Sequence, residues 1–561
     1  LLQVIILFQN IEPLLMKSNF RVLLVYPNLP LMLVPPLAVA LFTTIIRDAG
    51  YSVSLFDTTD YIDQDDGSSP RNRVKYLQAR DFDENEDLGV SVKTGLFNDY
   101  EKKVIEYAPE VIIYVAVVED TFIKTLGMIN KVAKFNIPFI LGGIFPSATP
   151  EKCLSYDAIN YVGIGEGEST VIDFINCVYS GGDLKKINGT AHLNDDGLVV
   201  KTEAQSLVNI EDVEPDFSLF AEERFYRPMG GQIFKSMPIE TYRGCPYQCT
   251  YCNSPGYRDN GRAAIIAKNL NQTEKFSNKF LRRKSMENLN NEIGKTVSKF
   301  KPEFLYFVDD SFMARPKAEM VNFCKMYSKY KLPFWFNTRP ENCTEENLKL
   351  LKDVGCFRIS FGIECGNEEF RTNSLRRKGS NDDIQNWFNT ISDSGIPYSV
   401  NLIIGFPGET REMVMETVEL TRNINRFDTI TVSIFTPYHG TVLRDVAVKN
   451  GWLDDSVITV HTTSSSLLDM PPPFLSKQDI DGLMKVMPLY VYFDKKEWPN
   501  IYKIEQMDVG WEELYDYYSF RYKTEFLRED NALIDNMYPS RVIVGSNSLQ
   551  AKLFAKLLVW I

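Results

Sequence analysis

Residues 241–252 read TYRGCPYQCTYC, a short stretch that contains three of the nine cysteines in this chain of 561 residues. The three are Cys245, Cys249 and Cys252, in the spacing Cys-x3-Cys-x2-Cys. Because cysteine is rare here, such a spacing should arise by chance in only about one of several hundred such sequences. Gly244 and Pro246 allow a tight wrap, so the three thiolates can converge on one metal centre.

The number of thiolates distinguishes between two kinds of metal site. A structural zinc site normally has four protein ligands, whereas a 4Fe-4S cluster held by three thiolates leaves one iron open to a small molecule. No fourth cysteine follows at close spacing. Four other cysteines are interpreted as buried reduced thiols, namely Cys324, Cys343, Cys356 and Cys365. The spacing favours the cluster, and a zinc site completed from elsewhere in the chain stays open as an alternative.

Composition narrows the range of partners. With 44% hydrophobic residues the chain is long enough for two or three domains, each with its own core. The formal charge of -13 argues against nucleic acid, because binding to nucleic acid depends on concentrated Lys and Arg. Two short basic runs, at 282–284 and 376–378, are interpreted as solvated helix faces. The odd number of cysteines without a secretory signal predicts reduced thiols and a cytoplasmic protein.

No transmembrane segment is expected, because the longest apolar run, 111–118, falls far short of the roughly 20 residues that a membrane span needs. Residues 1–19 are interpreted as a leader. Its apolar start has no basic flank and is interrupted by Glu12 and Pro13, so a non-native stretch before Met16 fits it better than a secretory signal. The closing residues 542–561 are given the same interpretation.

Residues 20–185 alternate apolar strands with helices, which predicts a parallel sheet covered on both faces. Such a sheet binds ligands in the loops at the carboxyl ends of its strands. Two of these loops read GGIFP (142–146) and GIGEGE (163–168), and neither is a P-loop or a dinucleotide fingerprint. The strands are expected at 21–26, 53–56, 111–118, 138–141 and 161–163.

The remainder of the chain divides into three parts. Residues 186–235 are interpreted as a linker with a small hairpin at Asn194-Asp195-Asp196-Gly197. Residues 236–450 predict a parallel barrel or part of one. Residues 451–561 are expected to be mainly helical, with Ser476 capping a helix that has Asp479 at its third position. The six barrel strands are expected at 240–242, 304–308, 334–337, 358–362, 398–404 and 429–435.

The cysteine loop, with aromatic Tyr251 before its last cysteine, resembles the radical S-adenosylmethionine (SAM) superfamily. The preceding domain resembles the cobalamin-binding domain of the cobalamin-dependent branch. The resemblance implies an α/β chain with an N-terminal Rossmann-like cobalamin-binding domain, a partial (β/α)6 radical SAM barrel and a mainly helical C-terminal region. It also implies that SAM chelates the open iron and is cleaved reductively to methionine and a 5′-deoxyadenosyl radical. The electron would come from an external one-electron reductant of the flavodoxin or ferredoxin type.

Motifs along the barrel match the family in order and imply contacts with SAM. Carboxylates after the second strand would receive the SAM amino group, as an ammonium beside the cluster requires. An arginine after the third strand could reach the SAM carboxylate. Motifs on the fourth and fifth strands, 361–366 and 401–410, lie near the ribose and the adenine. The residues so assigned are Tyr251, Asp309, Asp310, Arg339, Glu364, Asn401, Ile403 and Glu409.

The match to the cobalamin branch is softer. Residues assigned to cobalamin are Pro36, Asp57, Asp120, Thr121, Gly142, Gly143, Gly165, Glu166 and Gly167. Asp120 and Thr121 either bond the amides of the corrin or cap a helix. The Asp-x-His-x-x-Gly loop is absent, and none of the three histidines (His192, His439 and His461) is expected in the sheet domain. Bound cobalamin should therefore lack a histidine ligand. A degenerate domain that no longer binds cobalamin stays open.

The leading expectation is a cobalamin-dependent methyltransferase acting on an unactivated carbon or phosphorus of a small-molecule or lipid-like substrate. A cobalamin-containing radical cyclase or rearrangement enzyme is the alternative within the enzyme class. A non-catalytic cluster or zinc-binding module is the alternative outside it.

Overall fold

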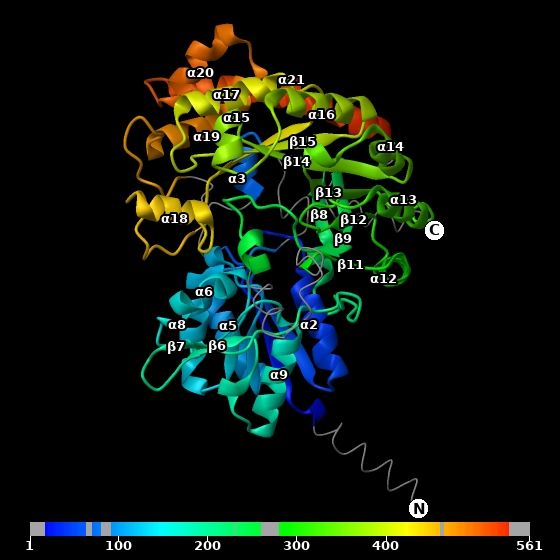
Figure 1. The fold of residues 1–561 in the computed structure, drawn as a ribbon, viewed down its shortest axis with the longest axis vertical. Helices are drawn as coiled ribbons and strands as arrows, with labels where there is room; N and C mark the ends of the chain where they lie inside the picture. Colours follow the sequence, from blue (N-terminus) through cyan, green and yellow to red (C-terminus); the bar gives the residue numbers. More distant parts are fainter. Residues whose placement is uncertain are drawn as a thin grey trace, which may run out of the picture. The chain divides into compact units, whose positions relative to one another are not determined.

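The computed structural model describes residues 17–62, 70–79, 91–229, 232–259, 280–460 and 465–537. Most of the interpreted leader, His461 and residues 542–561 lie outside this part of the chain. The chain forms two compact units (Figure 1). The first falls within 1–65, 92–222 and 253–283, and the second within 66–91, 223–252 and 284–561.

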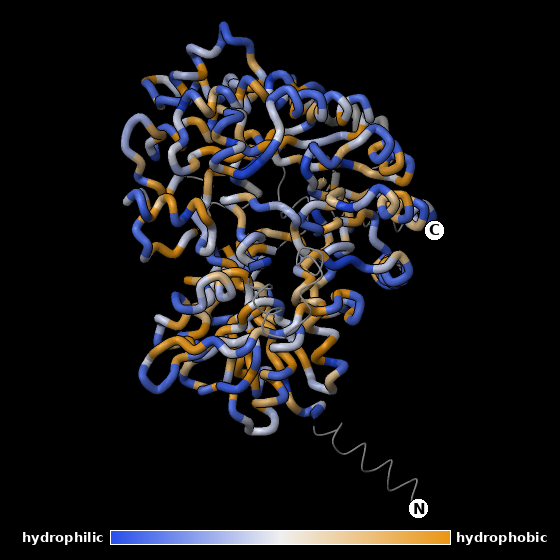
Figure 2. Tube along the Cα trace, in the orientation of Figure 1, coloured by the Kyte–Doolittle hydropathy of each residue, from blue (hydrophilic) through white to orange (hydrophobic). Residues whose placement is uncertain are grey.

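The first unit is built on a seven-stranded sheet in the order β2-β1-β3-β4-β5-β6-β7. Strands β1 to β5 are parallel, as predicted. Apolar residues concentrate along these strands (Figure 2). The parallel strands are β1 (Arg21–Tyr26), β2 (Ser52–Asp57), β3 (Val111–Tyr114), β4 (Phe139–Leu141) and β5 (Tyr161–Gly163). The helices of this unit are α2 (Leu37–Asp48), α5 (Leu96–Tyr107), α6 (Glu119–Val132), α7 (Ile144–Ala148), α8 (Pro150–Leu154) and α9 (Gly167–Ser180).

Strand β3 is shorter than the apolar run suggests. It ends at Tyr114 although the run continues to Val118, because Ala116 takes φ 55° and turns the chain. The Val117 N–H then donates to the carbonyl of Gly142 at 2.9 Å. The loop after β3 is thereby tied to the loop after β4.

The hairpin expected in a linker belongs to the first sheet instead. Its strands β6 (Thr190–Leu193) and β7 (Val199–Lys201) extend the sheet in antiparallel fashion from β5. The expectation that no histidine lies in the sheet domain is therefore wrong, since His192 is on β6. Its partner is Tyr161, the first residue of β5, so His192 lies away from the loops that follow the parallel strands. Burial lowers the pKa of His192.

The second unit contains a curled sheet in the order β16-β15-β14-β13-β12-β9-β8, in which only β8 is antiparallel. The strands at the two ends of this order, β16 and β8, do not pair with each other. The sheet is therefore open and forms a half-barrel, as predicted. The strands are β8 (Tyr226–Met229), β9 (Gln232–Ile239), β12 (Phe304–Phe307), β13 (Phe334–Thr338), β14 (Cys356–Glu364), β15 (Tyr398–Ile404) and β16 (Thr429–Ile434). The strand expected at 240–242 is wrong: the first parallel strand is β9, whose last residue, Ile239, already pairs with Phe307 at the end of β12.

One face of the half-barrel is packed by helices. Phe307 packs against Phe323 of α13 (Lys317–Tyr327), and Phe361 against Phe388 of α16 (Asn381–Ser394). Residues that alternate with these along the strands point to the other face. We call this second face the open face, because most of its residues stay partly or fully exposed; it comprises Tyr306, Trp335, Asn337, Asn401, Ile403, Thr431 and Ser433.

Apart from α3, the other helices of the second unit follow its strands or form the C-terminal region. They are α3 (Pro70–Lys75), α12 (Met286–Phe300), α14 (Glu345–Asp353), α15 (Glu368–Asn373), α17 (Arg411–Arg422), α18 (Val442–Lys449), α19 (Lys477–Tyr492), α20 (Trp498–Glu505) and α21 (Trp511–Met537). The predicted cap of α19 is confirmed: Ser476 and Asp479 form a capping box. Helix α3 comes from the first 80 residues, yet Gln78 just after it donates to the Val432 carbonyl of edge strand β16 at 2.8 Å.

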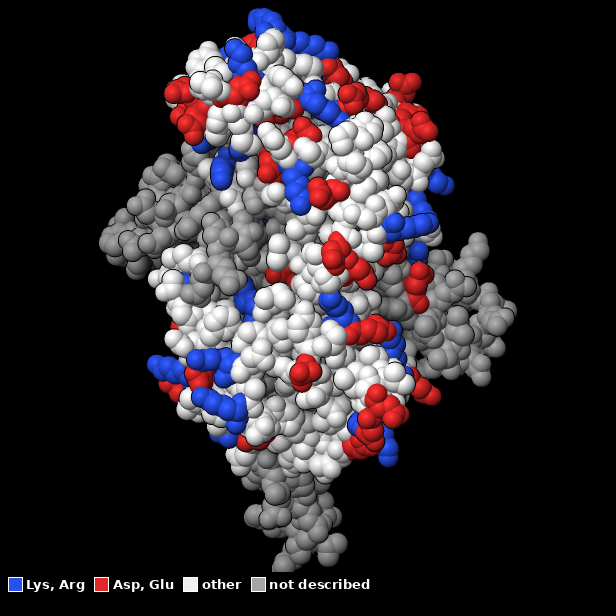
Figure 3. Space-filling view, turned by 90° about the vertical axis from the view of Figure 1, so that its left-hand side faces the viewer, with Lys and Arg blue, Asp and Glu red and all other residues white. Residues whose placement is uncertain are grey.

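Acidic and basic side chains are interspersed on the face shown in Figure 3. None of the helices in the described part of the chain combines the length and the apolarity that a membrane span requires.

Candidate functional site

The cysteine loop begins directly after β10 (Tyr242–Arg243), where Gly244 takes φ 101° and turns the chain. Cys245 and Cys249 are partly exposed and Cys252 is exposed, and none is in a disulfide. By contrast, Cys324, Cys343, Cys356 and Cys365 are all buried free thiols, as predicted. The three loop cysteines are thus the accessible ones in the second unit.

Thr250 anchors the loop to two distant segments. Its hydroxyl donates to the carbonyl of Ser374 at 2.6 Å and its N–H to that of Leu375 at 3.4 Å. Its own carbonyl accepts from the N–H of Leu443 in α18 at 3.1 Å. The Thr250 side chain, which follows the second cysteine, therefore points into the protein.

A cation lies against one of the loop sulfurs. Nη2 of Arg339, after β13, donates to Sγ of Cys249 at 3.4 Å, and Nη1 contacts Glu341 at 3.0 Å. The guanidinium also stacks on the ring of Tyr247, 3.8 Å from its centre. Tyr247 is fixed in turn by donating to Asn342 at 2.8 Å. The structure thus brings Arg339, one of the residues assigned to SAM, to the cysteine loop.

Tyr251 and Glu364 meet at a buried arginine. The Tyr251 hydroxyl donates to Glu364 at 3.3 Å, and Arg377 lies 3.2 Å from that hydroxyl and 3.5 Å from the carboxylate. Burial raises the pKa of Glu364, and Arg377 opposes this rise. A Cβ on Gly362 would stand 2.2 Å from the Glu364 carboxylate, so a side chain at this position would have to displace that carboxylate. The interpretation of run 376–378 as solvated is wrong for Arg377, which is buried.

The two carboxylates after β12 differ in their surroundings. Asp309 is buried and accepts from the N–H groups of Thr241 at 2.8 Å and Tyr242 at 3.2 Å, and it pairs with Arg315 at 2.8 Å. Burial raises the pKa of Asp309 to about 6 although Arg315 lowers it. Asp310 is exposed. Burial raises the pKa of the Cys245 thiol to about 11, with Asp310 among the groups that raise it further.

The fifth-strand residues also separate into two groups. Asn401 and Ile403 lie on the open face. Glu409 is fully buried and accepts from the N–H groups of Gly405 at 2.6 Å and Phe406 at 3.2 Å, which fixes the turn after β15. Burial raises the pKa of Glu409 to about 8.

The donor set of the loop fits an iron–sulfur cluster. Three thiols from one loop, with an arginine on one sulfur, supply the soft anionic ligands and the compensating charge that such a cluster needs. No three His, Cys, Asp or Glu side chains converge closely enough for a single ion among the residues that the structure describes. In a cluster each thiolate binds a different iron, so its ligands stand farther apart than around one ion.

In the first unit, the loops after β4 and β5 are joined by one side chain. The Ser147 hydroxyl donates to the Gly143 carbonyl at 2.7 Å and accepts from the Gly165 N–H at 2.9 Å. A Cβ on Gly143 would stand 2.3 Å from the backbone nitrogen of Val117, whereas one on Gly165 would meet open space. Gly143 is thus required by packing, whereas the space beside Gly165 is open.

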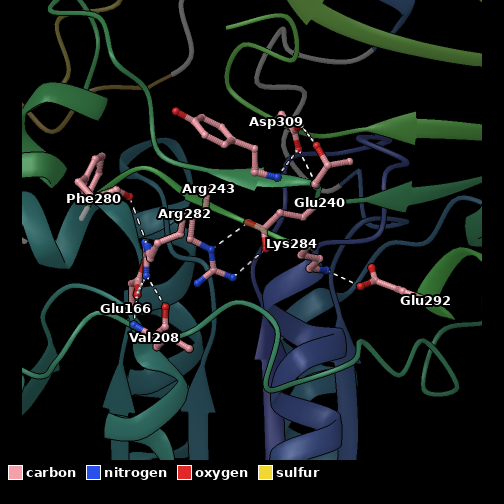
Figure 4. A network of polar contacts seen from close by, with 11 residues as sticks. Glu166, Val208, Glu240, Arg243, Phe280, Arg282, Lys284, Glu292 and Asp309 are labelled. Carbon is pink, nitrogen blue, oxygen red and sulfur yellow. Dashed lines mark hydrogen bonds and ion pairs between the residues drawn. The ribbon is translucent and has the colours of Figure 1, made fainter. Parts of the chain in front are cut away.

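Glu166 is engaged within its own unit. Its carboxylate forms a two-pronged ion pair with Arg282 and accepts from the N–H of Val208 at 2.8 Å (Figure 4). The interpretation of run 282–284 as solvated is therefore wrong for Arg282, and also for Lys284, which is buried and paired with Glu292. Neither pairing is signalled locally in the sequence, because Glu166 is 116 residues from Arg282 and Glu292 lies on helix α12.

The remaining cobalamin-assigned residues lie at the ends of elements. Pro36 precedes α2, and Asp57 ends β2 and accepts from the N–H of Thr59 at 3.0 Å. Asp120 is in the first turn of α6, where the buried Thr121 hydroxyl donates to the Val118 carbonyl at 3.1 Å. Gly167 begins α9 against the ring of Phe42, 2.7 Å from where its Cβ would be.

Several residues of these sites were missed by sequence reasoning. Arg315, Arg377 and Thr250 hold site residues in place, and Ser147 links the two glycine loops. The buried charges were hidden in runs of ordinary polar sequence. A signal was available only for Thr250, which lies within the cysteine motif itself.

Two families match this chain. Residues 239–421 match the Radical SAM superfamily, and residues 74–175 match the B12 binding domain. Curated relatives include an uncharacterized methyltransferase of Pyrococcus horikoshii, 24% identical over 64% of this chain and 73% of the relative. Another is the anaerobic magnesium-protoporphyrin IX monomethyl ester cyclase of Rubrivivax gelatinosus, 24% identical over 55% of this chain and 53% of the relative. The chain thus spans about half the length of that cyclase.

Solved structures share the fold. TsrM of Kitasatospora setae, a radical SAM methyltransferase solved with cobalamin and a [4Fe-4S] cluster, has a TM-score of 0.58 at 16% identity, covering 91% of this chain and 99% of that one. OxsB, a cobalamin-dependent SAM radical enzyme, has a TM-score of 0.59 at 15% identity, covering 94% and 76%.

Proposed function

Since this chain belongs to the radical SAM superfamily and carries a B12-binding domain ahead of its half-barrel, we propose that it is a cobalamin-dependent methyltransferase. Its cofactors are a 4Fe-4S cluster, SAM and cobalamin. When bound, these cofactors supply the electron that cleaves SAM and the carrier that delivers a methyl group. The acceptor that we propose is an unactivated carbon or phosphorus of a small-molecule or lipid-like substrate. An external one-electron reductant of the flavodoxin or ferredoxin type would feed the cluster.

The chain's own residues would divide the work as follows. Cys245, Cys249 and Cys252 would hold the cluster, with Thr250 keeping their loop against the barrel. Arg339 would place a positive charge on one ligand sulfur. A hydrogen bond from an arginine to a cluster sulfur stabilises the reduced, more negatively charged cluster. It therefore raises the reduction potential of the cluster.

SAM would lie along the strand ends of the half-barrel. The Glu364 carboxylate would accept hydrogen bonds from the ribose hydroxyls, and Arg377 keeps this carboxylate oriented. Asn401 and Ile403 are the partly exposed residues of β15 that would contact the adenine. Asp310 is the exposed one of the two carboxylates proposed for the amino group, and the internally bonded Asp309 would act by positioning the loop.

One observation carries the proposal: a loop of three accessible cysteines, fixed by Thr250 and touched by Arg339, stands in the same chain as a sheet whose strand-end loops leave room at Gly165. Methyl transfer is favoured over other outcomes because the methyltransferase from Pyrococcus horikoshii is matched over 73% of its length. The match to the cyclase from Rubrivivax gelatinosus supports ring formation as the second candidate.

Isotope labelling separates the two candidates. The anaerobically reconstituted protein is incubated with methyl-labelled SAM, a low-potential reductant and candidate substrates. Label in the product together with 5′-deoxyadenosine supports methyl transfer, whereas 5′-deoxyadenosine with an unlabelled cyclised product supports the cyclase. A protein that binds zinc tightly and shows no 4Fe-4S absorption would contradict both.

A further inference from the structure

We propose that Arg227, with Arg73 beside it, binds an anionic group of the substrate at the aromatic end of the open face. The inference rests on the proposed function, because it takes the open face of the half-barrel as the place where substrate lies. It adds a chemical class for that substrate: a molecule that carries a phosphate, phosphonate or carboxylate.

Arg227 lies on β8, the antiparallel strand at one end of the half-barrel. Its guanidinium carbon is 4.4 Å from the centre of the Tyr306 ring. Tyr306 in turn stacks on Trp335, with ring centres 4.3 Å apart and planes inclined by 25°. Both rings belong to the open face, so the guanidinium and the two rings form one continuous surface there.

This surface rests on an apolar base. Trp335 packs in a buried cluster with Phe234, Phe304 and Phe357, and Tyr306 packs against that cluster from a partly exposed position. The four-residue cluster itself is apolar, and the Tyr306 hydroxyl beside it is a polar partner of the arginine. The Nη1 atom of Arg227, which has no hydrogen bond, must find a partner on the side away from the cluster.

Arg227 differs from the paired buried arginines of the second unit. Buried Arg315, Arg358 and Arg377 each face a carboxylate, namely Asp309, Asp428 and Glu364. Arg227 has no carboxylate partner within the described chain, and its Nη1 atom is buried without a hydrogen bond. An arginine fork of this kind binds carboxylate or phosphate through two parallel hydrogen bonds.

Arg73 brings a second positive charge to the same place. It lies on α3, which Gln78 ties to the second unit through the Val432 carbonyl. Burial lowers the pKa of Arg227, and the charge of Arg73 lowers it further. Arg73 has no carboxylate partner among the residues described, and its pKa is lowered by burial. Two like charges held together without an anion are destabilising, so a bound anion would relieve their repulsion.

The rest of the open face suits the body of such a substrate. Tyr306 and Trp335 offer flat apolar surface, and Asn337, Thr431 and Ser433 offer hydrogen-bonding groups that remain partly or fully exposed. The anionic end is therefore expected near Arg227 and the polar or reacting end farther along the strands.

The test uses the full chain, reconstituted with its cluster under anaerobic conditions, and three probes of similar size: phenyl phosphate, benzoate and neutral benzyl alcohol. Binding is measured by isothermal titration calorimetry. We expect Arg227→Gln to weaken binding of the better anionic probe about tenfold to a hundredfold, since hydrogen bonds to a charged group are lost. Arg227→Lys should fall between, and Arg73→Gln should weaken binding by a smaller factor.

Arg21→Gln is the matched control, because it removes the same charge from an exposed ion pair with Glu110 in the first unit. Its binding should stay within about twofold of the unchanged protein. Tighter binding of phenyl phosphate assigns a phosphoryl group, and tighter binding of benzoate assigns a carboxylate. The inference is overturned if neither anion binds better than benzyl alcohol, or if Arg227→Gln and Arg73→Gln both bind the anions as the control does.

A separate measurement keeps this inference apart from the proposed function. Formation of 5′-deoxyadenosine from SAM and a chemical reductant, without substrate, is followed in every variant. Retained SAM cleavage with lost anion binding supports the site, whereas absence of SAM cleavage in the unchanged protein counts against the proposed function while the calorimetry still decides on the anion.

Discussion

Replacing Asp309 with alanine should loosen the chain immediately before the cysteine loop. The carboxylate holds the N–H groups of Thr241 and Tyr242 and the guanidinium of Arg315, all of which are buried. The change therefore tests whether this acidic residue positions the loop or contacts SAM directly.

The size of the effect follows from the groups that lose their partner. Each buried N–H left unsatisfied costs about 1–3 kcal/mol, and a buried guanidinium without its carboxylate costs at least as much. In the opposite direction, alanine avoids the cost of burying a charge, the cost that raises the pKa of Asp309 to about 6, and this offsets part of the loss. The free energy of unfolding should fall by about 3 kcal/mol, which lowers the melting temperature of a unit of this size by about 4 °C.

The assay compares Asp309→Ala with Asp310→Ala, whose carboxylate is exposed. Melting temperature, iron content after reconstitution and SAM affinity are measured for both under anaerobic conditions. Asp309→Ala should melt lower and retain less iron, while Asp310→Ala should melt as the unchanged protein does and bind SAM more weakly. An Asp309→Ala protein with unchanged melting temperature and iron content, but weakened SAM binding, would refute the positioning role.

Three further changes test other parts of the molecule. Because burial raises the pKa of Glu409 to about 8, the folded protein holds a proton that the unfolded chain has lost, and stability falls by up to about 1.4 kcal/mol per pH unit as pH rises from about 4.5 to 8. As pH rises across this window, the melting temperature of Glu409→Gln should therefore increase relative to that of the unchanged protein. A difference between the two that is independent of pH would contradict the reasoning. Gly143→Ala should lower the free energy of unfolding of the first unit by about 3 kcal/mol and abolish its retention of cobalamin, because the new methyl group meets neighbouring backbone at 2.3 Å. Gly142→Ala, whose nearest contact is at 3.9 Å, should melt as the unchanged protein does. Arg377→Gln leaves the carboxylate of Glu364 without its cation and should cost about 3 kcal/mol in chemical denaturation and weaken SAM binding in dialysis; unchanged values in both would contradict the pairing.

Elements with strong local signals were predictable from the sequence. Strand β15 was expected at its observed bounds, because its apolar run is enclosed by Pro397 and Gly405. The cap of α19 was equally local, since Ser476 and Asp479 are three residues apart. The cysteine loop combined rare residues with a rare spacing. In each case the deciding interactions lie within about ten residues of one another.

Features that depend on distant partners were not predictable. Helix α3 was assigned with the first sheet, and the bond from Gln78 to Val432 spans 354 positions of sequence. The first barrel strand was misplaced because 240–242 lies directly beside the cysteine motif, whereas pairing with β12 fixes β9 earlier. Arg282 and Arg377 were interpreted as solvated because their carboxylate partners are brought near only by folding.

The same distinction explains why the cysteine spacing alone left zinc open. Spacing sets how many thiolates a loop can offer, but the metal also depends on the charge and geometry that the rest of the fold imposes on them. Here the loop is held by contacts of Thr250 that reach as far as Leu443, and the sulfur of Cys249 accepts a hydrogen bond from Arg339. A cation on a thiolate stabilises the negative charge that a cluster spreads over its sulfurs and tunes its reduction potential. The arginine therefore fits a cluster, while the choice against zinc rests on the number of thiolates, because a structural zinc site needs a fourth protein ligand.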